Sequence, residues 1–244
     1  MPARVLVVPC YNEAARLDVE RWLRFANEGD ARILFVDDGS RDETLRVLSE
    51  LAARAPERIS VLHLSMNGGK GEAVRAGLLR AVELGVDEVG YSDADFATPP
   101  EEFTRLWAAL EATPTLVGVI GSRVKTLGTT IDRRIVRHYL GRVFATGAAI
   151  ALGRAVYDTQ CGAKVFRVGA ALESALATPF VSRWAFDVEL LARIFQASPP
   201  NADVIHELPL RTWIHVSGSK LRPTGMLQAS LDLARIGWAR RRAR

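Results

Sequence analysis

The sequence contains few residues of the kinds that build disulfide or zinc scaffolds. Its 244 residues include two cysteines, Cys10 and Cys161, which lie far apart and in no metal-ligand spacing. So few cysteines in a chain of this length indicate reduced thiols and a cytoplasmic location rather than a disulfide framework. The four histidines are scattered along the chain, and we expect them to be structural or surface residues.

Long hydrophobic runs are also missing. The first apolar run, Val5–Val8, leads directly into polar residues, so it predicts a buried strand rather than a signal peptide or an anchor. The apolar stretch Val143–Leu152 is too short to span a bilayer, which needs roughly 20 apolar residues. No repeat or low-complexity segment occurs either. The sequence therefore predicts a globular chain without a transmembrane segment.

The composition is that of an ordinary globular protein. Hydrophobic residues make up 48% and charged residues 25% of the chain, and its length permits a substantial core. The net charge of +4 is unevenly distributed, because residues 220–244 contain seven basic residues and one acid. Such a basic tail favours an anionic lipid surface or a nucleic acid as partner, and a solvated tail without a partner is the other interpretation.

The first half of the chain alternates short apolar runs with segments of helical spacing. The predicted strands are Val5–Val8, Ile33–Val36, Ile59–Leu64, Glu88–Tyr91 and Leu116–Ile120, and the predicted helices are Val19–Asn27, Glu43–Ala53, Glu72–Leu84 and Glu101–Leu110. Strands that alternate with helices in this way indicate βαβ units. We therefore predict an α/β fold with a mostly parallel sheet that is covered by helices on both faces.

The second half of the chain is less regular. It predicts helices over Arg133–Leu152, Ala170–Ala177 and Trp184–Phe195, and strands at Val165–Phe166 and Val204–Trp213. A final helix over residues 224–240 places these apolar side chains on one face: Leu227, Leu231, Ala234 and Trp238. Because arginines follow it, this face predicts either peripheral contact with an anionic membrane or docking on the protein's own core.

Polar clusters follow four of the predicted strands. They are residues 9–13 (Pro-Cys-Tyr-Asn-Glu), 37–40 (Asp-Asp-Gly-Ser), 67–71 (Asn-Gly-Gly-Lys-Gly) and 92–95 (Ser-Asp-Ala-Asp). In an open parallel sheet the carboxyl ends of the strands meet at one rim, where ligands bind. One such cluster alone is a weak signal, since acids and glycines also form turns and caps. Four clusters in register predict a functional site at this rim.

Asp93 and Asp95 form an Asp-x-Asp pair at the end of a predicted strand. Alternation sends both side chains to one side, where their oxygens suit Mg²⁺ or Mn²⁺ and a diphosphate adds further ligands. Such a metal would neutralise the charge on a departing nucleoside diphosphate. A turn-capping pair is the plainer interpretation of the same residues.

Two further groups suit a nucleotide. Asp37 and Asp38 can accept hydrogen bonds from a base or a ribose, because Gly39 and Ser40 already provide the turn. The glycines around Lys70 allow a close backbone approach to an anion, with Lys70 as a point charge. This glycine-rich stretch is a weak signal by itself, and it lacks the spacing of a P-loop.

Together these motifs resemble those of family 2 glycosyltransferases in order and spacing. The resemblance implies a GT-A fold over residues 1–219, with a Rossmann-like nucleotide-binding half to about residue 122, an acceptor half after it, and a basic tail over 220–244. It implies Mg²⁺ or Mn²⁺ as cofactor, held by Asp93 and Asp95. The residues implied for donor binding are Pro9, Tyr11, Asn12, Glu13, Asp37, Asp38, Gly39, Lys70 and Asp93.

Later segments narrow this resemblance to the dolichyl-phosphate β-glucosyltransferase branch. They are residues 121–123 (Gly-Ser-Arg), 158–166 (Asp-Thr-Gln-Cys-Gly-Ala-Lys-Val-Phe), 184–191 (Trp-Ala-Phe-Asp-Val-Glu-Leu-Leu), and Trp213 followed by residues 218–220 (Gly-Ser-Lys). The branch implies an inverting transfer of glucose from UDP-glucose to a polyprenyl phosphate at the cytoplasmic face of a membrane. Because the sequence lacks the N-terminal membrane helix of the eukaryotic enzymes, we expect a polyprenol other than dolichol.

A phosphate acceptor needs cations more than it needs a base, because its second pKa of about 6 leaves it ionised near neutral pH. Arg123 and Lys220 are candidates within the family-like segments, and Arg133 and Arg134 are candidates outside them. Gln160 can donate hydrogen bonds to the sugar or to the acceptor.

A hydroxyl acceptor, soluble or on a glycan, would instead need a general base, and Asp187 is the candidate carboxylate. The alternative roles of Asp187 are to orient a neighbour such as Arg123 or to cap the helix in which it lies. Cys161 is expected to be a packing residue, because the reaction gives a thiolate no task.

Two functions of other classes stay open. A protein that binds nucleotide sugars without turning them over would have no use for Lys70, Asp93 and Asp95 together. A nucleic-acid-binding domain is suggested only by the basic tail, which no recognition motif or interleaved aromatic residue accompanies. We therefore expect a nucleotide-sugar donor, a polyprenyl-phosphate acceptor and a membrane surface as partners, and no nucleic acid.

Overall fold

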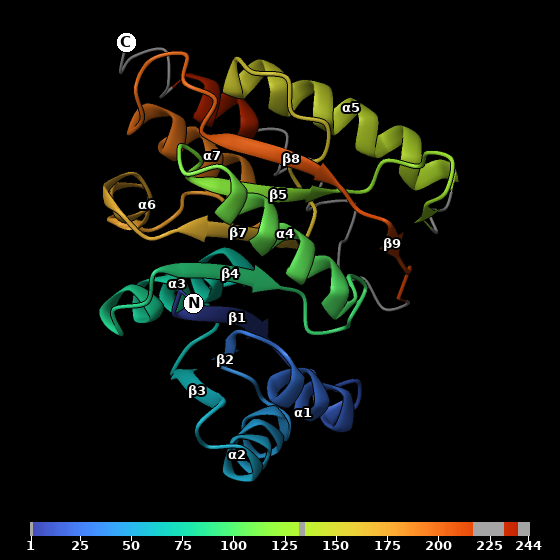
Figure 1. Cartoon of the computed structure of the whole chain (residues 1–244), viewed down its shortest axis with the longest axis vertical. Helices are drawn as coiled ribbons and strands as arrows, with labels where there is room; N and C mark the ends of the chain where they lie inside the picture. The colour runs from blue at the N-terminus through green and yellow to red at the C-terminus, as the bar shows by residue number, and fades with distance from the viewer. Residues whose placement is uncertain (1, 132–134, 217–231, 239–244) are drawn as a thin grey trace.

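The computed structural model describes residues 2–131, 135–216 and 232–238, and only the backbone of residues 135–143. One seven-stranded sheet runs in the order β3-β2-β1-β4-β7-β5-β8, and β6 and β9 form a second, two-stranded sheet (Figure 1). The strands are β1 (Arg4–Cys10), β2 (Arg32–Asp38), β3 (Ile59–Leu64), β4 (Glu88–Ser92), β5 (Gly118–Ser122), β6 (Thr130–Ile131), β7 (Ala163–Arg167), β8 (Ile205–Pro209) and β9 (Thr212–Trp213). Only β7 runs antiparallel to its neighbours in the larger sheet. The predicted mostly parallel sheet is confirmed.

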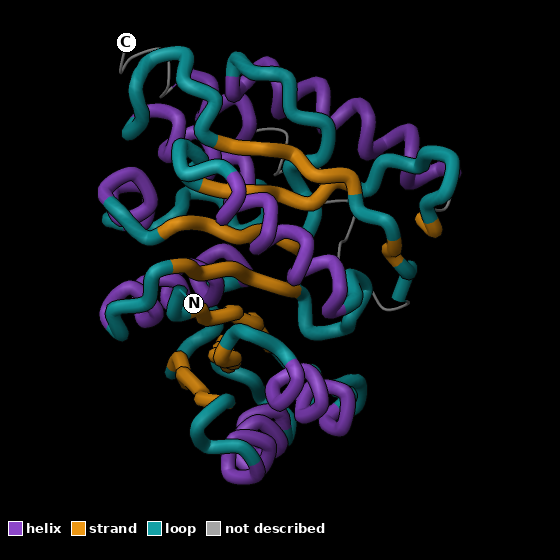
Figure 2. The backbone as a smooth tube through the Cα atoms, in the orientation of Figure 1, coloured by secondary structure: helices purple, strands orange, loops and turns teal. Residues whose placement is uncertain are grey.

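Helices lie on both faces of the larger sheet (Figure 2). They are α1 (Val19–Glu28), α2 (Thr44–Arg54), α3 (Lys70–Glu83), α4 (Pro100–Ala112), α5 (Ile135–Leu152), α6 (Ala170–Leu176) and α7 (Phe186–Gln196). Alternate side chains of β1 enter different cores: Leu6 and Val8 face α1, α2 and α4, whereas Val5 and Val7 face α3, α6 and α7. Both faces of β1 are therefore apolar, as expected of a central parallel strand.

One edge of this sheet collects the carboxyl ends of its parallel strands. There β1 ends at Cys10, β2 at Asp38, β4 at Ser92 and β5 at Ser122. Because β7 runs in the opposite direction, the segment 158–162 that precedes it reaches the same edge. The starts of α3 and α7 also meet here, where the first residues of each helix touch. The fold thus brings the predicted polar clusters to one rim.

The predicted strand over residues 204–213 is wrong as a single element. Its first part is β8, which ends at Pro209, and its last part pairs with β6 outside the main sheet. Between them the buried carboxylate of Glu102 accepts the backbone amides of Arg211 and Thr212, each at 2.9 Å. A tertiary contact with α4 therefore breaks the strand, and the apolar pattern alone gives no sign of it.

Residues 232–238 are helical and dock on α5 and α7. Leu233 and Ile236 are buried in that contact, whereas Ala234 and Trp238 lie on the exposed side. Docking of the predicted face on the core is thus wrong for its described members, because Leu233 and Ile236 make that contact, and contact of the face with a membrane stays a prediction. Its other members lie outside the described residues: Leu227 and Leu231. Among the helices that the structure describes, none has the length and apolarity that a membrane crossing requires.

Candidate functional site

Asp38 holds the loop that follows β3. Its Oδ1 accepts the backbone amide of Gly68 at 2.7 Å, and its Oδ2 accepts the amide of Gly69 and the side-chain amide of Asn67, both at 2.9 Å. Burial raises the pKa of Asp38 more than the amides of Gly68 and Gly69 lower it. These two amides are not available to an anion, because Asp38 already accepts hydrogen bonds from them.

The loop after β1 is joined to the loop after β2 by reciprocal hydrogen bonds. Asn12 donates its amide to Ser40 Oγ at 3.0 Å, and Asn12 Oδ1 accepts the amide of Arg41 at 2.8 Å. Asn12 has a φ of 51°, a left-handed conformation that Asn tolerates better than most residues. Gly39, with a φ of 62°, approaches Asn67 so closely that a Cβ would meet its backbone nitrogen. Asn12 and Gly39 therefore shape the rim through backbone geometry.

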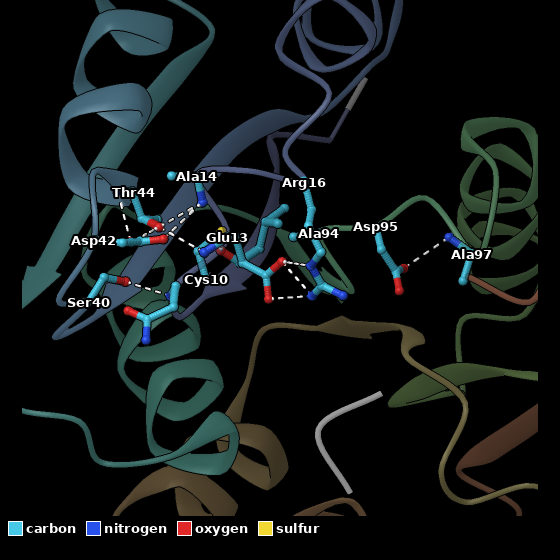
Figure 3. A network of polar contacts seen from close by, with 12 residues as sticks. Cys10, Glu13, Ala14, Arg16, Ser40, Asp42, Thr44, Ala94, Asp95 and Ala97 are labelled. Atoms are coloured by element: carbon cyan, nitrogen blue, oxygen red, sulfur yellow. Dashed lines mark hydrogen bonds and ion pairs between the residues drawn. The ribbon is translucent and has the colours of Figure 1, made fainter. Parts of the chain in front are cut away.

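Glu13 makes a second connection from the same loop (Figure 3). Its amide donates a hydrogen bond to Thr44 Oγ1 at 2.8 Å. Its carboxylate accepts hydrogen bonds from two nitrogens of Arg16, from Nε at 2.8 Å and from Nη2 at 2.6 Å. Figure 3 shows Arg16 between Glu13 and Asp95. Its charge opposes the rise in the pKa of Asp95. The structure thus adds to the rim a guanidinium for which the sequence predicts no role.

Asp37, at the end of β2, is fully buried. Its Oδ2 lies 2.8 Å from Nδ1 of His63, which is its partner in register on β3. The amide of Ser40 donates to its other oxygen at 3.4 Å. His63 thus makes a structural contact with Asp37, a residue that the sequence predicts to bind the nucleotide-sugar donor. Pro9 and Tyr11 lie partly buried at the end of the neighbouring β1.

Asp93, just beyond β4, is held from two sides. Lys70, the first residue of α3, donates its Nζ to Asp93 Oδ1. Burial disfavours the charged form of Lys70, but the carboxylates around it, Asp93 first and then Asp187, raise its pKa. On the other side, a Cβ at Gly162 would overlap Asp93 Oδ2. A side chain at position 162 would therefore require this carboxylate to move.

Asp95 lies on the same turn as Asp93. Its Oδ1 accepts the amide of Ala97 at 3.0 Å, and burial and then the charge of Asp93 raise its pKa. Two carboxylates that oppose each other's ionisation gain from a cation between them, and their hard oxygens suit Mg²⁺ or Mn²⁺. Within the described part of the chain, no cluster of three or more acidic, histidine or cysteine side chains forms a metal site. The hard oxygens of Asp93 and Asp95 fit such a metal, and a diphosphate could supply it with further oxygen ligands.

Arg123, directly after β5, is paired with Asp158. Its Nε and Nη2 each donate to one carboxylate oxygen at 2.7 Å, and its backbone amide donates to Oδ2 at 3.1 Å. Its guanidinium carbon lies 5.3 Å from the centre of the Trp213 ring. Burial opposes the charge on Arg123, but Asp158 outweighs it and raises the pKa. The partner that orients Arg123 is thus Asp158, so Arg123 is not the neighbour that Asp187 orients.

Asp187, in the first turn of α7, is buried and bonded at one oxygen. Its Oδ1 accepts the hydroxyl of Tyr91 and the Nζ of Lys164, the latter at 2.6 Å. Lys164 is completely buried and also donates to the carbonyl of Cys161 at 2.5 Å. Burial, and then the charge of Asp187, raise the pKa of Tyr91, which therefore remains a neutral donor. The alternative that Asp187 caps its helix is wrong, because α7 has no side-chain cap.

Three buried polar atoms near Arg123 have no hydrogen-bond partner in the described part of the chain: Ser122 Oγ, Thr159 Oγ1 and Gln160 Nε2. Leaving a buried polar group unpaired costs about 1–3 kcal/mol, so native proteins rarely tolerate it without a function. These atoms can still form hydrogen bonds, so they indicate where a polar ligand could bind. Cys161, beside them, is buried and free, and burial raises the pKa of its thiol to about 11. That fits the packing role expected of it.

Three predicted acceptor residues lie outside the described residues: Arg133, Arg134 and Lys220. Tyr91 and Lys164 have no role in the sequence-based predictions above. Strand alternation could have placed Tyr91 on the face that carries Asp93, and Lys164 on the matching face of β7. Arg16 and His63 gave no comparable signal, because their contacts depend on how neighbouring loops and strands meet.

Comparisons with known proteins agree with these features. The model of glycosyl transferase family 2 matches residues 5–173. A dolichyl-phosphate beta-glucosyltransferase of Trichomonas vaginalis is 34% identical over 94% of this chain and 69% of its own length. One of Drosophila melanogaster is also 34% identical, over 96% of this chain and 74% of its own length. A polyprenol monophosphomannose synthase of Mycolicibacterium smegmatis is 28% identical, with 96% and 86% covered.

Solved structures show the same fold. Glucosyl-3-phosphoglycerate synthase from Mycobacterium tuberculosis, in complex with Mn²⁺, UDP and glucosyl-3-phosphoglycerate, matches with a TM-score of 0.67 at 20% identity. The match covers 98% of this chain and 80% of that one. Its complex with Mn²⁺, UDP and phosphoglyceric acid gives a TM-score of 0.69 at 19% identity, over 98% and 78% of the two chains. At this identity the likeness shows the fold alone, and the predicted GT-A fold is confirmed. With the family model over most of its length and relatives above 30% identity, the chain belongs to glycosyl transferase family 2 and is a glycosyltransferase.

Proposed function

We propose that the protein is an inverting transferase that moves glucose from UDP-glucose to a polyprenyl phosphate, with Mg²⁺ or Mn²⁺ held by Asp93 and Asp95. The names of its relatives support the donor sugar and the acceptor, because they refer to dolichyl phosphate, glucose and a polyprenol monophosphate sugar. Complexes of the structural neighbour contain UDP with Mn²⁺ or Mg²⁺, which supports the nucleotide and the metal.

The observation that carries the proposal is the grouping of Lys70, Asp93 and Asp95 at the rim. A diphosphate brings negative charge to this point, and Lys70 supplies a cation there without a metal. When bound, the metal would stabilise the charge that develops on the leaving diphosphate. The loops held by Asn12, Glu13 and the two carboxylates of β2 give the nucleotide a preformed frame.

In the proposed reaction an oxygen of the acceptor phosphate attacks the anomeric carbon opposite the diphosphate. The new bond joins that carbon to the phosphate oxygen, while the bond to UDP breaks and UDP leaves with the electron pair. The acceptor phosphate is already ionised, since its second pKa is about 6. Arg123 can hold it, because Nη1 makes no hydrogen bond in the described structure while Asp158 fixes the other nitrogens. Gln160 Nε2 is a further donor for the sugar or the acceptor.

We place donor binding in residues 1–122, acceptor binding in residues 123–219, and contact with the cytoplasmic face of a membrane in the basic tail, 220–244. The tail is basic in sequence, and Trp238, near its cluster of arginines, has an exposed fraction of 57%. An interfacial tryptophan beside arginines is the arrangement expected of a peripheral membrane anchor.

The test is a transfer assay with labelled UDP-glucose, Mn²⁺ or Mg²⁺, and a polyprenyl phosphate. Label should enter the organic phase only with metal, and Asp95→Asn should abolish it. Asp87→Asn, which changes a carboxylate at the opposite end of β4, is the matched control and should leave transfer unchanged. Label that enters the organic phase from GDP-mannose and not from UDP-glucose would show that the donor is GDP-mannose. Release of UDP only with hydroxyl acceptors would overturn the lipid-phosphate acceptor, and binding of UDP-glucose without any turnover would overturn the transfer reaction.

A further inference from the structure

The turn that carries Asp93 and Asp95 is packed against α1. Phe96 is buried, and both Ala94 and Phe96 belong to the core that α1 and α2 form with β1 and β2. Asp93 and Asp95 alternate with them and are partly exposed. Successive residues of the turn thus have opposite surroundings, because two apolar side chains enter the core while two carboxylates lie at the rim.

Trp22, on α1, contacts this turn in two ways. Its Nε1 donates a hydrogen bond to the backbone carbonyl of Ala94 at 3.2 Å, and its ring centre lies 4.2 Å from that of Phe96. Trp22 is fully buried, and its ring also packs edge-on against Phe35 of β2 at 5.2 Å. Arg21 adds a further contact, because its guanidinium carbon lies 4.3 Å from the centre of the Phe96 ring. Two consecutive residues of α1 therefore hold the apolar members of the turn.

Phe96 has a backbone conformation that its side chain disfavours. Its φ of 54° lies in the left-handed region, where a bulky residue is a clear outlier. Such a conformation persists only where the surrounding contacts impose it, and conformations of this kind cluster at functional sites. Phe96 lies between Asp95 and Ala97, whose amide donates to Asp95 Oδ1 at 3.0 Å (Figure 3). The left-handed residue is therefore enclosed by the hydrogen bond that holds the Asp95 carboxylate.

We propose that α1 sets the relative position of the two carboxylates that bind the metal, and that Trp22 and Phe96 are positioning residues for Asp93 and Asp95. The inference rests on the proposed function and deepens it. Asp93 directly follows β4, whereas Asp95 lies two residues further from the strand. The hydrogen bond to Ala94 and the packing of Phe96 fix the backbone on both sides of Asp95. A divalent cation needs both carboxylates in place at once, so this anchor reduces the ordering that its binding requires.

The test measures the affinity for Mn²⁺ with saturating UDP, from the electron paramagnetic resonance signal of free Mn²⁺. Trp22→Phe keeps an aromatic ring against Phe96 and removes the hydrogen-bond donor to Ala94. Trp107→Phe is the matched control. Trp107 is a buried residue of α4, and its ring centre lies 5.2 Å from the guanidinium carbon of Arg4, at the end of β1 opposite the rim. UDP binding without metal and thermal melting are measured for each variant.

We expect Trp22→Phe to weaken Mn²⁺ binding by about tenfold, the lower end of the loss found when groups that orient metal ligands are removed. Its affinity for UDP without metal should be unchanged, because the anchor acts on the metal ligands. Trp107→Phe should bind Mn²⁺ as wild type does. A tryptophan with a merely structural role would lower the Tm when replaced and leave the Mn²⁺ affinity of the folded protein unaltered.

A second pair of variants tests the backbone conformation of the turn. Phe96→Gly and Phe96→Ala remove the same ring, but only alanine keeps a Cβ that opposes a left-handed φ. The unfolding equilibrium constant of Phe96→Gly should therefore be smaller than that of Phe96→Ala, by about fivefold. Both variants should bind Mn²⁺ more weakly than wild type, because the packing on Trp22 is lost.

The inference is overturned if Trp22→Phe melts like Trp107→Phe and binds Mn²⁺ as wild type does. Equal stability of the two Phe96 variants would also overturn it, since the turn would then not be held in a left-handed conformation. If Trp22→Phe does not fold, the Phe96 variants decide alone, and unchanged Mn²⁺ affinity in them overturns the inference.

Failure of the proposed function is a separate result. A wild-type protein that binds Mn²⁺ with UDP but labels no lipid has a different acceptor, and the comparison of the variants still decides whether α1 positions the carboxylates. A wild-type protein that binds UDP but no Mn²⁺ overturns both the proposed metal and this inference.

Discussion

Two regions of the rim differ in how their polar groups are paired. One consists of the loops after β1, β2 and β3, and the other of the segments after β5 and before β7. In the first region the polar groups form hydrogen bonds with one another. Asp38 accepts hydrogen bonds from two loop amides, and the amide of Asn12 donates to Ser40 in the neighbouring loop. In the second region, Ser122 Oγ and Thr159 Oγ1 are buried without a partner in the described structure. The named polar groups of the first region are thus paired within the protein, whereas these two hydroxyl groups of the second region are not.

This difference indicates two ways of preparing a binding surface. The frame that we propose for the nucleotide is held by hydrogen bonds within the protein itself, so little ordering would have to occur if the donor binds there. The other side retains unpaired donors that cost stability until a ligand satisfies them. Such groups discriminate strongly, because a ligand that cannot pair with them leaves them buried and unmet.

The largest of these effects is expected for Gly162→Ala, which changes the contact of the segment before β7 with Asp93, the partner of Lys70. The new Cβ would overlap Asp93 Oδ2 and push the carboxylate from its place beside Lys70. Displacements of about 1 Å at a reacting centre can cost about 100-fold, so we expect a loss of at least that size in kcat/KM for transfer. Gly169→Ala is the matched control, since open space surrounds that position. Similar activities for the two variants would refute the role given to this contact.

Asp38→Asn should break the preorganised side. The single side-chain oxygen of an asparagine cannot take the place of both carboxylate oxygens, so the amide of Gly68 or of Gly69, both partly buried, would lose its acceptor. We expect the free energy of unfolding in urea to fall by about 1–3 kcal/mol, and UDP binding to weaken with it. Asp30→Asn, at the exposed opposite end of the same strand, should change neither. A stable Asp38→Asn variant would show that the frame does not depend on this carboxylate.

Thr159→Val, in the segment before β7, should affect substrate binding without lowering stability. Because the hydroxyl of Thr159 is unpaired in the described structure, its removal should leave the free energy of unfolding unchanged or raise it by up to about 1 kcal/mol. The KM of a substrate that pairs with it should rise about threefold to tenfold. Ser40→Ala, which deletes the acceptor for the Asn12 amide, should instead lower stability by about 1 kcal/mol. Equal stability losses in both variants would remove the contrast between the regions.

The smallest effect concerns Glu207, which accepts the backbone amides of Tyr157 and Asp158 at 2.8 and 2.7 Å. Burial, together with the charge of Asp158, raises its pKa more than those amides lower it. The native state therefore binds this proton more tightly than the unfolded chain does. The stability that the group contributes is present below its ordinary pKa of 4.5 and is lost as pH rises through the native value.

Glu207→Gln removes this titration, so the Tm of wild type minus the Tm of the variant should fall as the pH rises from about 4 to about 6. Thermal melts at matched ionic strength measure it, with the exposed Asp203→Asn variant as control. A constant difference across this range would mean that the carboxyl has an ordinary pKa in the native state.

The sequence by itself determined the parallel core and the rim at which the candidate site lies. Apolar runs of strand length that alternate with helical spacing have few stable arrangements other than a parallel sheet covered on both faces, and in such a sheet residues that follow strands meet at one rim. The pattern of strands and turns therefore suffices to bring Asp93, Asp95 and Lys70 together. It does not suffice to split residues 204–213 into β8 and β9, because Glu102 decides that division from another helix.

Only the tertiary structure decided how the charged side chains are paired. From sequence, Asp187 was a candidate base or a partner of Arg123, whereas the fold pairs Arg123 with Asp158 and commits Asp187 to Lys164. The physical reason is that pairing depends on which side chains come within about 4 Å across strands and helices far apart in the chain, where the interaction energy falls with distance. Periodicity reports which face a residue occupies, but it carries no information about the partner that the opposite element places there.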